Sequence, residues 1–170
     1  GQQTAIKLAA ERVKVAIIGR RKELVESLAR QIESAGGTAL PMAIDITQAN
    51  EVARCIDGVI KTFGQLDILV NAAGMLQSGN IETTSLEMWD KTMNINLRSL
   101  FNLMHLAVPH LIQTKGNIVN VSSVNGQRSF PNVLAYNVSK AGVDQLTRCA
   151  ALELADKGVR VNAVCPGVTI

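Results

Sequence analysis

The sequence predicts an α/β fold in which a doubly wound parallel sheet lies between two layers of helices. Segments with helical periodicity alternate with short apolar runs along the whole chain. These runs are almost continuously Val, Ile, Leu and Ala, which is typical of strands buried on both faces. The chain is 47% hydrophobic but only 3% aromatic, so its core is aliphatic and suits helices packed on a buried sheet. We therefore expect a three-layer α/β/α architecture.

The expected elements follow one another without a linker or an internal repeat. A glycine pair, Gly36 and Gly37, is expected to close the second helix, and Thr47 to cap the third. Residues 1–170 are accordingly predicted to form a single domain. We expect helices over residues 1–11, 22–37, 48–64, 85–114 and 133–158, and strands over 14–21, 38–47, 66–74, 116–123 and 159–167.

Polar or small residues stand where the predicted strands end. In open parallel sheets, ligands bind beyond the carboxyl ends of the strands. The sequence therefore predicts a ligand site at this edge of the sheet. The strand-end residues are Arg20, Asp45, Asn71, Ser123, Pro166 and Gly167.

Composition argues against several other classes of protein. The net charge of +3 and the lack of a basic run with interleaved aromatics disfavour a nucleic-acid partner. The longest apolar stretch, residues 100–112, is too short and too polar for a membrane span. No Cys/His/Asp cluster has metal-ligand spacing, so no metal site is expected. The cysteines are odd in number and widely spaced, as in an intracellular protein with reduced thiols: Cys55, Cys149 and Cys165.

The only tyrosine of the chain lies one helical turn before a lysine. Tyr136 and Lys140 share a helix face with Cβ atoms about 6 Å apart, and an ammonium beside a phenol favours the phenolate. Such a phenol can exchange a proton with a carbonyl or alcohol oxygen that Ser123 also holds, while a cofactor carries the hydride. Taken alone, a tyrosine and lysine at this spacing arise by chance, and Ser123 could merely cap a turn.

With NINLRSLF added to this pattern, the chain resembles the short-chain dehydrogenase/reductase family over essentially its whole length. The resemblance is to members such as 3-oxoacyl carrier-protein reductases and carbonyl reductases, which have a Rossmann-like fold. It implies Tyr136 as the acid/base and Ser123 as the residue that orients the substrate oxygen. Lys140 would assist Tyr136 and bind the nicotinamide ribose, and Asn96 would hold a water of a proton relay.

The resemblance also implies the residues that bind a dinucleotide. Gly1 matches a glycine of the phosphate loop, and Arg20 and Arg21 stand where relatives that prefer NAD place an acidic residue. A missing carboxylate and a guanidinium suit a 2′-phosphate, so NADP(H) is favoured over NAD(H); two arginines that merely begin a solvated helix face are the alternative. The further implied contacts are Asp45 at the adenine, Asn71, Ala72 and Gly74 of NAAG, Tyr136 and Lys140, and Pro166 and Gly167 of the PG turn.

We thus expect a partial dinucleotide-binding and catalytic domain that interconverts a ketone or aldehyde and an alcohol. Relatives carry a first strand and a C-terminal region that this sequence lacks, so the fold is expected to be truncated at both ends. The isolated piece, in which KVAIIG and LDILVNAAG lack a shared neighbour, is expected to be poorly stable and inactive. A catalytically silent dinucleotide-binding regulator and a Rossmann-type methyltransferase are the alternatives.

Two long helices, around residues 97–112 and 135–155, are apolar on more than one side. We expect them to pair copies of the chain into a homodimer or homotetramer, although a covering intrachain segment is the alternative. The expected location is the cytoplasm, with an organelle left open because the sequence lacks a natural start.

Overall fold

The structure is a computed structural model that describes residues 1–167, and its contacts divide the chain into two compact units. The first unit comprises residues 1–65, and the second begins at Leu66. Helices and strands alternate along both units in the expected order. No helix in the described part of the chain combines the length and apolarity needed to cross a bilayer.

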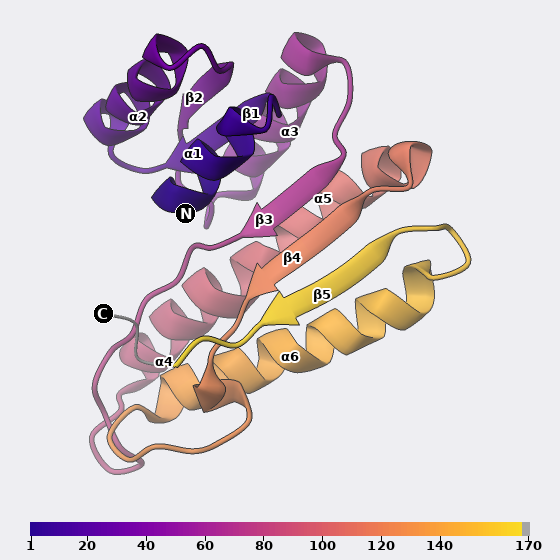
Figure 1. Cartoon of the computed structure of the whole chain (residues 1–170). Helices are drawn as coiled ribbons and strands as arrows, with labels where there is room; N and C mark the ends of the chain where they lie inside the picture. The colour runs from indigo at the N-terminus through magenta and orange to yellow at the C-terminus, as the bar shows by residue number, and fades with distance from the viewer. Residues whose placement is uncertain (168–170) are drawn as a thin grey trace. The chain divides into compact units, whose positions relative to one another are not determined.

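The first unit is a two-stranded parallel sheet with helices on both faces (Figure 1). β1 (Val15–Gly19) pairs in parallel with β2 (Ala39–Ala43). α1 (Gln2–Ala10) and α2 (Lys22–Ser34) share an aliphatic core with β1, while α3 (Ala49–Phe63) packs on the opposite face, where the thiol of Cys55 contacts Met42 at 3.4 Å. The shared core consists of Ala5, Ala9, Ile17, Val25, Ala29 and Ile32.

Of the two helix ends predicted from the sequence, the end of α2 is confirmed and the cap of α3 is not. Gly36 adopts φ +83°, a conformation that suits glycine, and the N–H of Gly37 donates to Ile32 O at the end of α2. Thr47 is not the cap of α3: the helix is preceded by Gln48, which makes no side-chain cap bond. The hydroxyl of Thr47 donates instead to the Asp45 carboxylate at 2.8 Å, because a charged acceptor just before it outcompetes the helix end.

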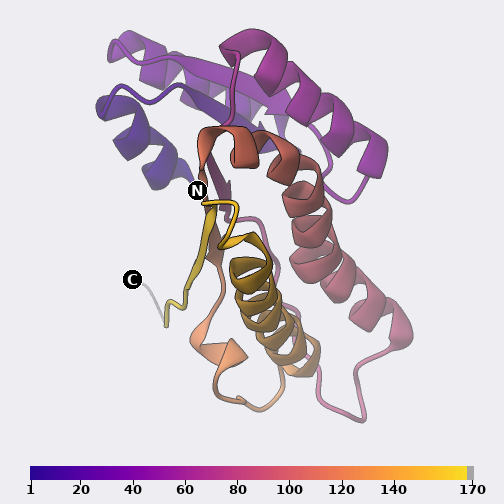
Figure 2. The same cartoon turned by 90° about the vertical axis from the view of Figure 1, so that its right-hand side faces the viewer.

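The second unit is a three-stranded parallel sheet in the order β3–β4–β5. β3 (Ile68–Asn71), β4 (Asn117–Val121) and β5 (Arg160–Val164) have α5 (Ser99–Thr114) and α6 (Leu134–Leu154) on one face (Figure 2). The predicted helix over residues 85–114 is continuous but contains a wider turn. It consists of α4 (Leu86–Met93), the π-helical segment η1 (Asn94–Arg98) and α5, with Ser85 as a side-chain cap. A short 3₁₀ segment, η2 (Val124–Gly126), follows β4.

In each sheet, the strand that was expected to lack a neighbour lies at an edge and has one partner. Among residues 1–167, β1 pairs only with β2 and β3 pairs only with β4, so neither has a second strand neighbour. This is the pairing deficit expected for KVAIIG and LDILVNAAG. That the isolated chain is poorly stable remains a prediction, as does its assignment as a single domain.

A buried chain of polar side chains ties the second sheet to α6. Asn71 Nδ2 of β3 donates to Asn120 Oδ1 of β4 at 2.9 Å, and Asn120 Nδ2 donates to Thr147 Oγ1 of α6 at 2.9 Å. Asn120 is completely buried and is the partner shared by Asn71 and Thr147, whose hydroxyl also donates to Val143 O at 2.7 Å. This chain fixes α6, which carries Tyr136 and Lys140, against the strand that leads to Ser123.

We expect Asn120→Ala to lower the free energy of unfolding by about 2 kcal/mol, because it leaves the buried amide donor of Asn71 without a partner and removes the hydrogen bond to Thr147. Chemical denaturation of the complete protein measures this change. Asn117→Ala is the matched control on the same strand, since the side-chain oxygen of Asn117 already has no hydrogen-bond partner. Equal losses in the two variants would contradict the role given to Asn120.

Candidate active site

A buried lysine lies at the centre of the predicted catalytic residues. Lys140, on α6, is only 5% exposed, and its Nζ donates to Val121 O at the end of β4 at 2.8 Å. Burial lowers the pKa of Lys140 below its usual value, while the negative charge of Asp144 acts in the opposite direction. An ammonium carries three donors, and this one uses a single donor on described residues. Its other donors are therefore available to a ligand.

Tyr136 lies one helical turn before Lys140, as the spacing predicted. Lys140 Nζ is 5.6 Å from the centroid of the Tyr136 ring, and the tyrosine is half-buried. The ammonium and the aromatic ring therefore share one face of α6, at its first turns. The contact places the lysine Nζ over the aromatic ring of the tyrosine.

Asn96 is buried in η1 and joins the loop after β3 to α6. Its Oδ1 accepts from Met75 N at 2.8 Å, and its Nδ2 donates to Met75 O at 2.8 Å and to Ser139 Oγ at 3.0 Å. Gly74 lies beside both Asn96 and Lys140: a Cβ built on this glycine would lie 3.5 Å from Asn96 Oδ1 and 3.6 Å from Lys140 Nζ. Both side-chain donors of Asn96 are in use, so a water could contact this side chain only at Oδ1. The water expected at Asn96 stays a prediction.

Ser123 stands two residues beyond the end of β4 and is 6% exposed. It does cap a turn: its Oγ accepts from Asn125 N at 3.2 Å, at the start of η2. The same hydroxyl donates to Asn125 Oδ1 at 3.1 Å. Capping and participation in the site are therefore compatible for this serine.

The predicted site residues divide between the two units. Within the second unit, Lys140, Tyr136, Asn96 and Gly74 are neighbours, and Ser123 follows Val121, whose carbonyl binds Lys140. Ala72 and Pro166 are exposed there, and Pro166 O accepts from Val124 N at 3.1 Å. Asn71, in contrast, is buried and binds Asn120, which fits a residue that supports the strands. The first unit carries Gly1, Arg20, Arg21 and Asp45, and the second also carries Gly167.

The candidate adenosine contacts of the first unit cluster at the ends of β1 and β2. The main-chain N–H and hydroxyl of Thr47 donate to the Asp45 carboxylate, and Arg20 lies close enough to act on it electrostatically. The Thr47 N–H and, more weakly, the Arg20 charge lower the pKa of Asp45, against the effect of its partial burial. Arg20 and Arg21 are exposed, and Gly1 is the residue before α1.

Sequence reasoning missed a buried carboxylate beside the lysine. Asp144 is 7% exposed and lies one turn after Lys140 on α6, and the thiol of Cys165 donates to its Oδ1 at 3.8 Å. Burial and the Asp144 charge raise the pKa of Cys165. The spacing of four residues from Lys140 was a signal that could have identified Asp144. Asn125, which accepts from Ser123, and Asn137, which accepts from the Asn125 amide at 2.7 Å, were also missed, and no local pattern marks them.

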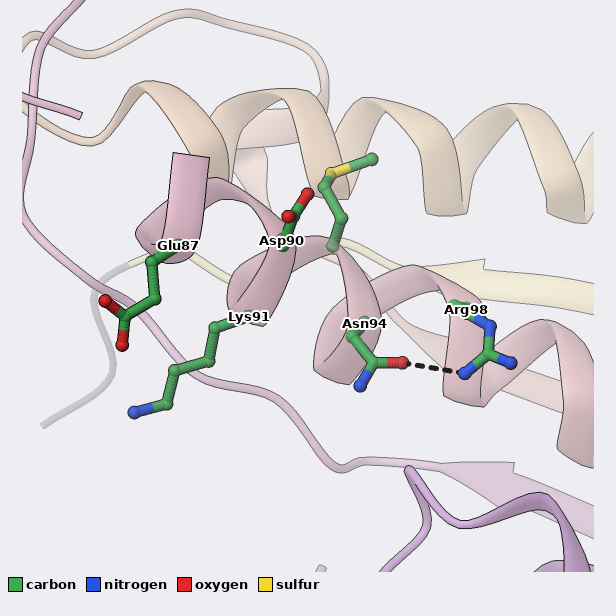
Figure 3. A pocket seen from close by; sticks show the side chains of 6 residues that line it. Glu87, Asp90, Lys91, Asn94 and Arg98 are labelled. Atoms are coloured by element: carbon green, nitrogen blue, oxygen red, sulfur yellow. Dashed lines mark hydrogen bonds between the residues drawn. The ribbon is translucent and has the colours of Figure 1, made fainter. Parts of the chain in front are cut away.

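A hollow of 890 Å³ lies elsewhere in the second unit, along α4 and η1 (Figure 3). It contains none of the predicted site residues. The side chains of Asn94 and Arg98 are joined there by a hydrogen bond of 3.1 Å, and the four charged residues of the lining balance one another. The hollow is therefore separate from the candidate active site. Its lining consists of Glu87, Asp90, Lys91, Met93, Asn94 and Arg98.

Known proteins resemble this chain over its whole length. The sequence profile of the family described as short chain dehydrogenase matches residues 1–170. A 3-oxoacyl-acyl-carrier-protein reductase of Thermotoga maritima is 36% identical over 98% of this chain and 68% of its own length. An oxidoreductase of uncharacterized activity from the same organism is 42% identical over 99% of this chain and 67% of its own length.

A solved structure gives the same result. The crystal structure of a 3-ketoacyl-ACP reductase from Sinorhizobium meliloti 1021 matches with a TM-score of 0.95 and 40% identity, over 98% of this chain and 67% of that one. The chain thus spans about two thirds of the length of these relatives. The likeness confirms the predicted fold class, a doubly wound, Rossmann-like α/β fold with three layers. The chain belongs to the short-chain dehydrogenase family of oxidoreductases.

Proposed function

We propose that the protein is an NADP(H)-dependent reductase that interconverts a ketone or aldehyde and an alcohol, with Asn96, Ser123, Tyr136 and Lys140 in its active site. The observation that carries the proposal is the position of Lys140 Nζ, 5.6 Å from the Tyr136 ring and 2.8 Å from the carbonyl that ends β4. An ammonium held at this point acts on the phenol and on any hydroxyl group that lies beside it. Chance spacing alone would not bury this lysine next to the end of the strand that leads to Ser123.

In the proposed reaction the chain's own residues handle the oxygen and its proton. Ser123 holds the carbonyl oxygen by a hydrogen bond, and Tyr136 donates a proton to that oxygen during reduction. In the oxidative direction Tyr136 accepts the proton of the alcohol. Lys140 stabilises negative charge on the phenol oxygen, and Asn96 keeps the loop after β3 against α6. A bound nicotinamide supplies the hydride to the carbonyl carbon, or takes it in reverse.

The residues present suit a dinucleotide. Lys140 retains donors for ribose hydroxyls, and the exposed stretch from Ala72 to Gly74 passes beside it with only small side chains. In the first unit, Asp45 accepts hydrogen bonds at the end of β2, as a contact to an adenine amino group requires. These features support a nicotinamide dinucleotide as the cofactor of this chain.

The preference for NADP(H) rests on the end of β1. Gly19 stands where a carboxylate would repel a 2′-phosphate, and Arg20 and Arg21 follow it with exposed side chains. A guanidinium offers paired donors to a phosphate. The charge of Asp45 near Arg20 also helps to retain the arginine at this strand end.

The relatives suggest a small carbonyl or alcohol substrate without identifying it. Two relatives are named as 3-oxoacyl-acyl-carrier-protein reductases, whereas a relative from Sphingobium indicum, 34% identical, is named as a dehydrogenase of a chlorinated cyclohexadiene diol. A screen of NADPH oxidation with the complete protein across acetoacetyl thioesters, diketones, sugars and steroids tests the proposal directly. A wild-type protein that binds NADPH but turns over no carbonyl compound would favour the silent regulator instead.

The cytoplasmic location stays a prediction.

Tyr136→Phe is expected to reduce turnover at least about a hundredfold, because it removes the proton donor. Binding of NADPH, followed by fluorescence titration, is expected to persist because Lys140 and the strand ends are unchanged. Ile81→Val, at a residue that is 80% exposed on a loop, provides a control for nonspecific effects of substitution. Undiminished turnover in Tyr136→Phe would contradict the mechanism.

Arg20→Asp is expected to raise the KM for NADPH by about tenfold or more and to leave or improve the KM for NADH, since it replaces a phosphate ligand with a repelling carboxylate. Steady-state kinetics with both cofactors measures the change in preference. Arg12→Asp, an exposed residue after α1, changes the net charge equally and serves as the control. The same ratio of KM values in wild type and Arg20→Asp would overturn the assignment.

We also propose that copies of the chain pair through the uncovered sides of α5 and α6. Phe101, stacked on His105, is 53% exposed on α5, and Leu152 is 81% exposed on α6. Sedimentation of the complete protein should give the mass of a dimer or tetramer, because burying such side chains is favourable. Leu152→Glu should lower that mass. A monomer at every concentration would refute the pairing.

A further inference from the structure

A directed chain of hydrogen bonds joins Ser123 to the residue that follows Tyr136. Ser123 Oγ donates to Asn125 Oδ1 at 3.1 Å, and Asn125 Nδ2 donates to Asn137 Oδ1 at 2.7 Å. Asn137 Nδ2 in turn donates to Phe130 O at 2.8 Å. The chain therefore begins at the end of β4, crosses to the first turn of α6 and ends on the loop between them.

The last acceptor fixes the direction of every bond in the chain. A main-chain carbonyl can only accept, so Asn137 must present its NH₂ group to Phe130 and its Oδ1 to Asn125. Asn125 must then present its own NH₂ group to Asn137, which leaves its Oδ1 toward Ser123. An amide oxygen cannot donate, so the hydrogen bond at Ser123 has to come from the serine hydroxyl.

This direction determines how Ser123 meets a substrate. Its oxygen already accepts from Asn125 N at 3.2 Å, and its proton lies on Asn125 Oδ1, so one lone pair remains. That lone pair can accept from an alcohol O–H without any rearrangement. A carbonyl oxygen, which only accepts, is served by rotation of the hydroxyl proton from Asn125 to the substrate, with the oxygen itself staying in place. Asn125 thus keeps the serine satisfied before binding and holds its oxygen during both directions of the reaction.

We propose that Asn125 and Asn137 are positioning residues that hold the Ser123 hydroxyl in register with Tyr136. The inference rests on the proposed function, since it gives Ser123 a substrate oxygen to bind. Asn137 is adjacent to Tyr136 in the sequence, so the same contact that orients Asn125 also ties the serine to the helix turn that carries the phenol. In this proposal neither asparagine contacts the substrate or the cofactor.

A double-mutant cycle in the complete protein tests this proposal. Asn125→Ala and Asn137→Ala are each expected to lower kcat/KM for a carbonyl substrate about tenfold or more, because small displacements of an orienting group are costly, with an unchanged KM for the cofactor. In a Ser123→Ala background, which has no hydroxyl to orient, each asparagine substitution is expected to change kcat/KM by less than about twofold. Gln127→Ala, on the same loop but outside the chain, is expected to leave kcat/KM unchanged.

A structural readout accompanies the kinetics. Amide hydrogen exchange at Asn125, whose N–H donates to Ser123 Oγ, is expected to accelerate in Asn137→Ala and in Ser123→Ala but not in Gln127→Ala. The asparagine substitutions could instead lower kcat/KM by the same factor whether residue 123 is serine or alanine. That result would assign both asparagines to loop stability alone and overturn the proposal. Unchanged kcat/KM in Asn125→Ala would overturn it as well. Failure of the proposed function is recognised separately: the wild type itself would then turn over no carbonyl compound, and both proposals would fall.

Discussion

The candidate active site depends on one buried ammonium. Removing a charge from water is costly unless hydrogen bonds and an opposite charge compensate, and Lys140 has both: the Val121 carbonyl at 2.8 Å and the field of Asp144. Asp144 lies on α6 itself, whereas the bond to Val121 joins α6 to β4 and so favours one register of the helix along the strand. The Asn71–Asn120–Thr147 chain maintains the same register from inside the unit. The position of Tyr136 follows from that register, because it lies one turn before the lysine.

The wider turn in the long helix also helps to hold α6 in place. An α-helix continued through residues 94–98 would place Asn96 on a different face, whereas the π-helical segment η1 buries it and directs its amide to Met75 and Ser139. Such turns cost hydrogen-bond geometry and occur frequently at functional sites. Here the hydrogen bonds of Asn96 offset that cost, since both side-chain donors of this residue are used to join the loop after β3 to α6. Ser139 passes the connection on, since its hydroxyl donates to Tyr136 O at 2.8 Å.

The sequence predicted the helices and strands of the described residues well, because these elements depend on periodicity. Alternating apolar runs and helical periodicity located all five strands and the long helices, and a separation of four residues placed Tyr136 and Lys140 on one face. Thr47 failed as a cap because Asp45, two residues earlier, is a stronger acceptor for its hydroxyl. Asn125 and Asn137 were not predictable, since they meet only after the loop between β4 and α6 has closed. Contacts of that kind leave no periodic trace in a sequence.

Groups that can only donate or only accept set the protons of the site. Lys140 is a pure donor anchored on Val121, and the Phe130 carbonyl is a pure acceptor at the end of the asparagine chain. The Phe130 carbonyl sets the orientation of the Asn137 and Asn125 amides, and the main-chain N–H and carbonyl of Met75 set that of Asn96. Hydroxyl groups alone can exchange the roles of donor and acceptor by rotating about one bond. Rotation of this kind is what the proposed reaction requires of the Ser123 and Tyr136 hydroxyl groups.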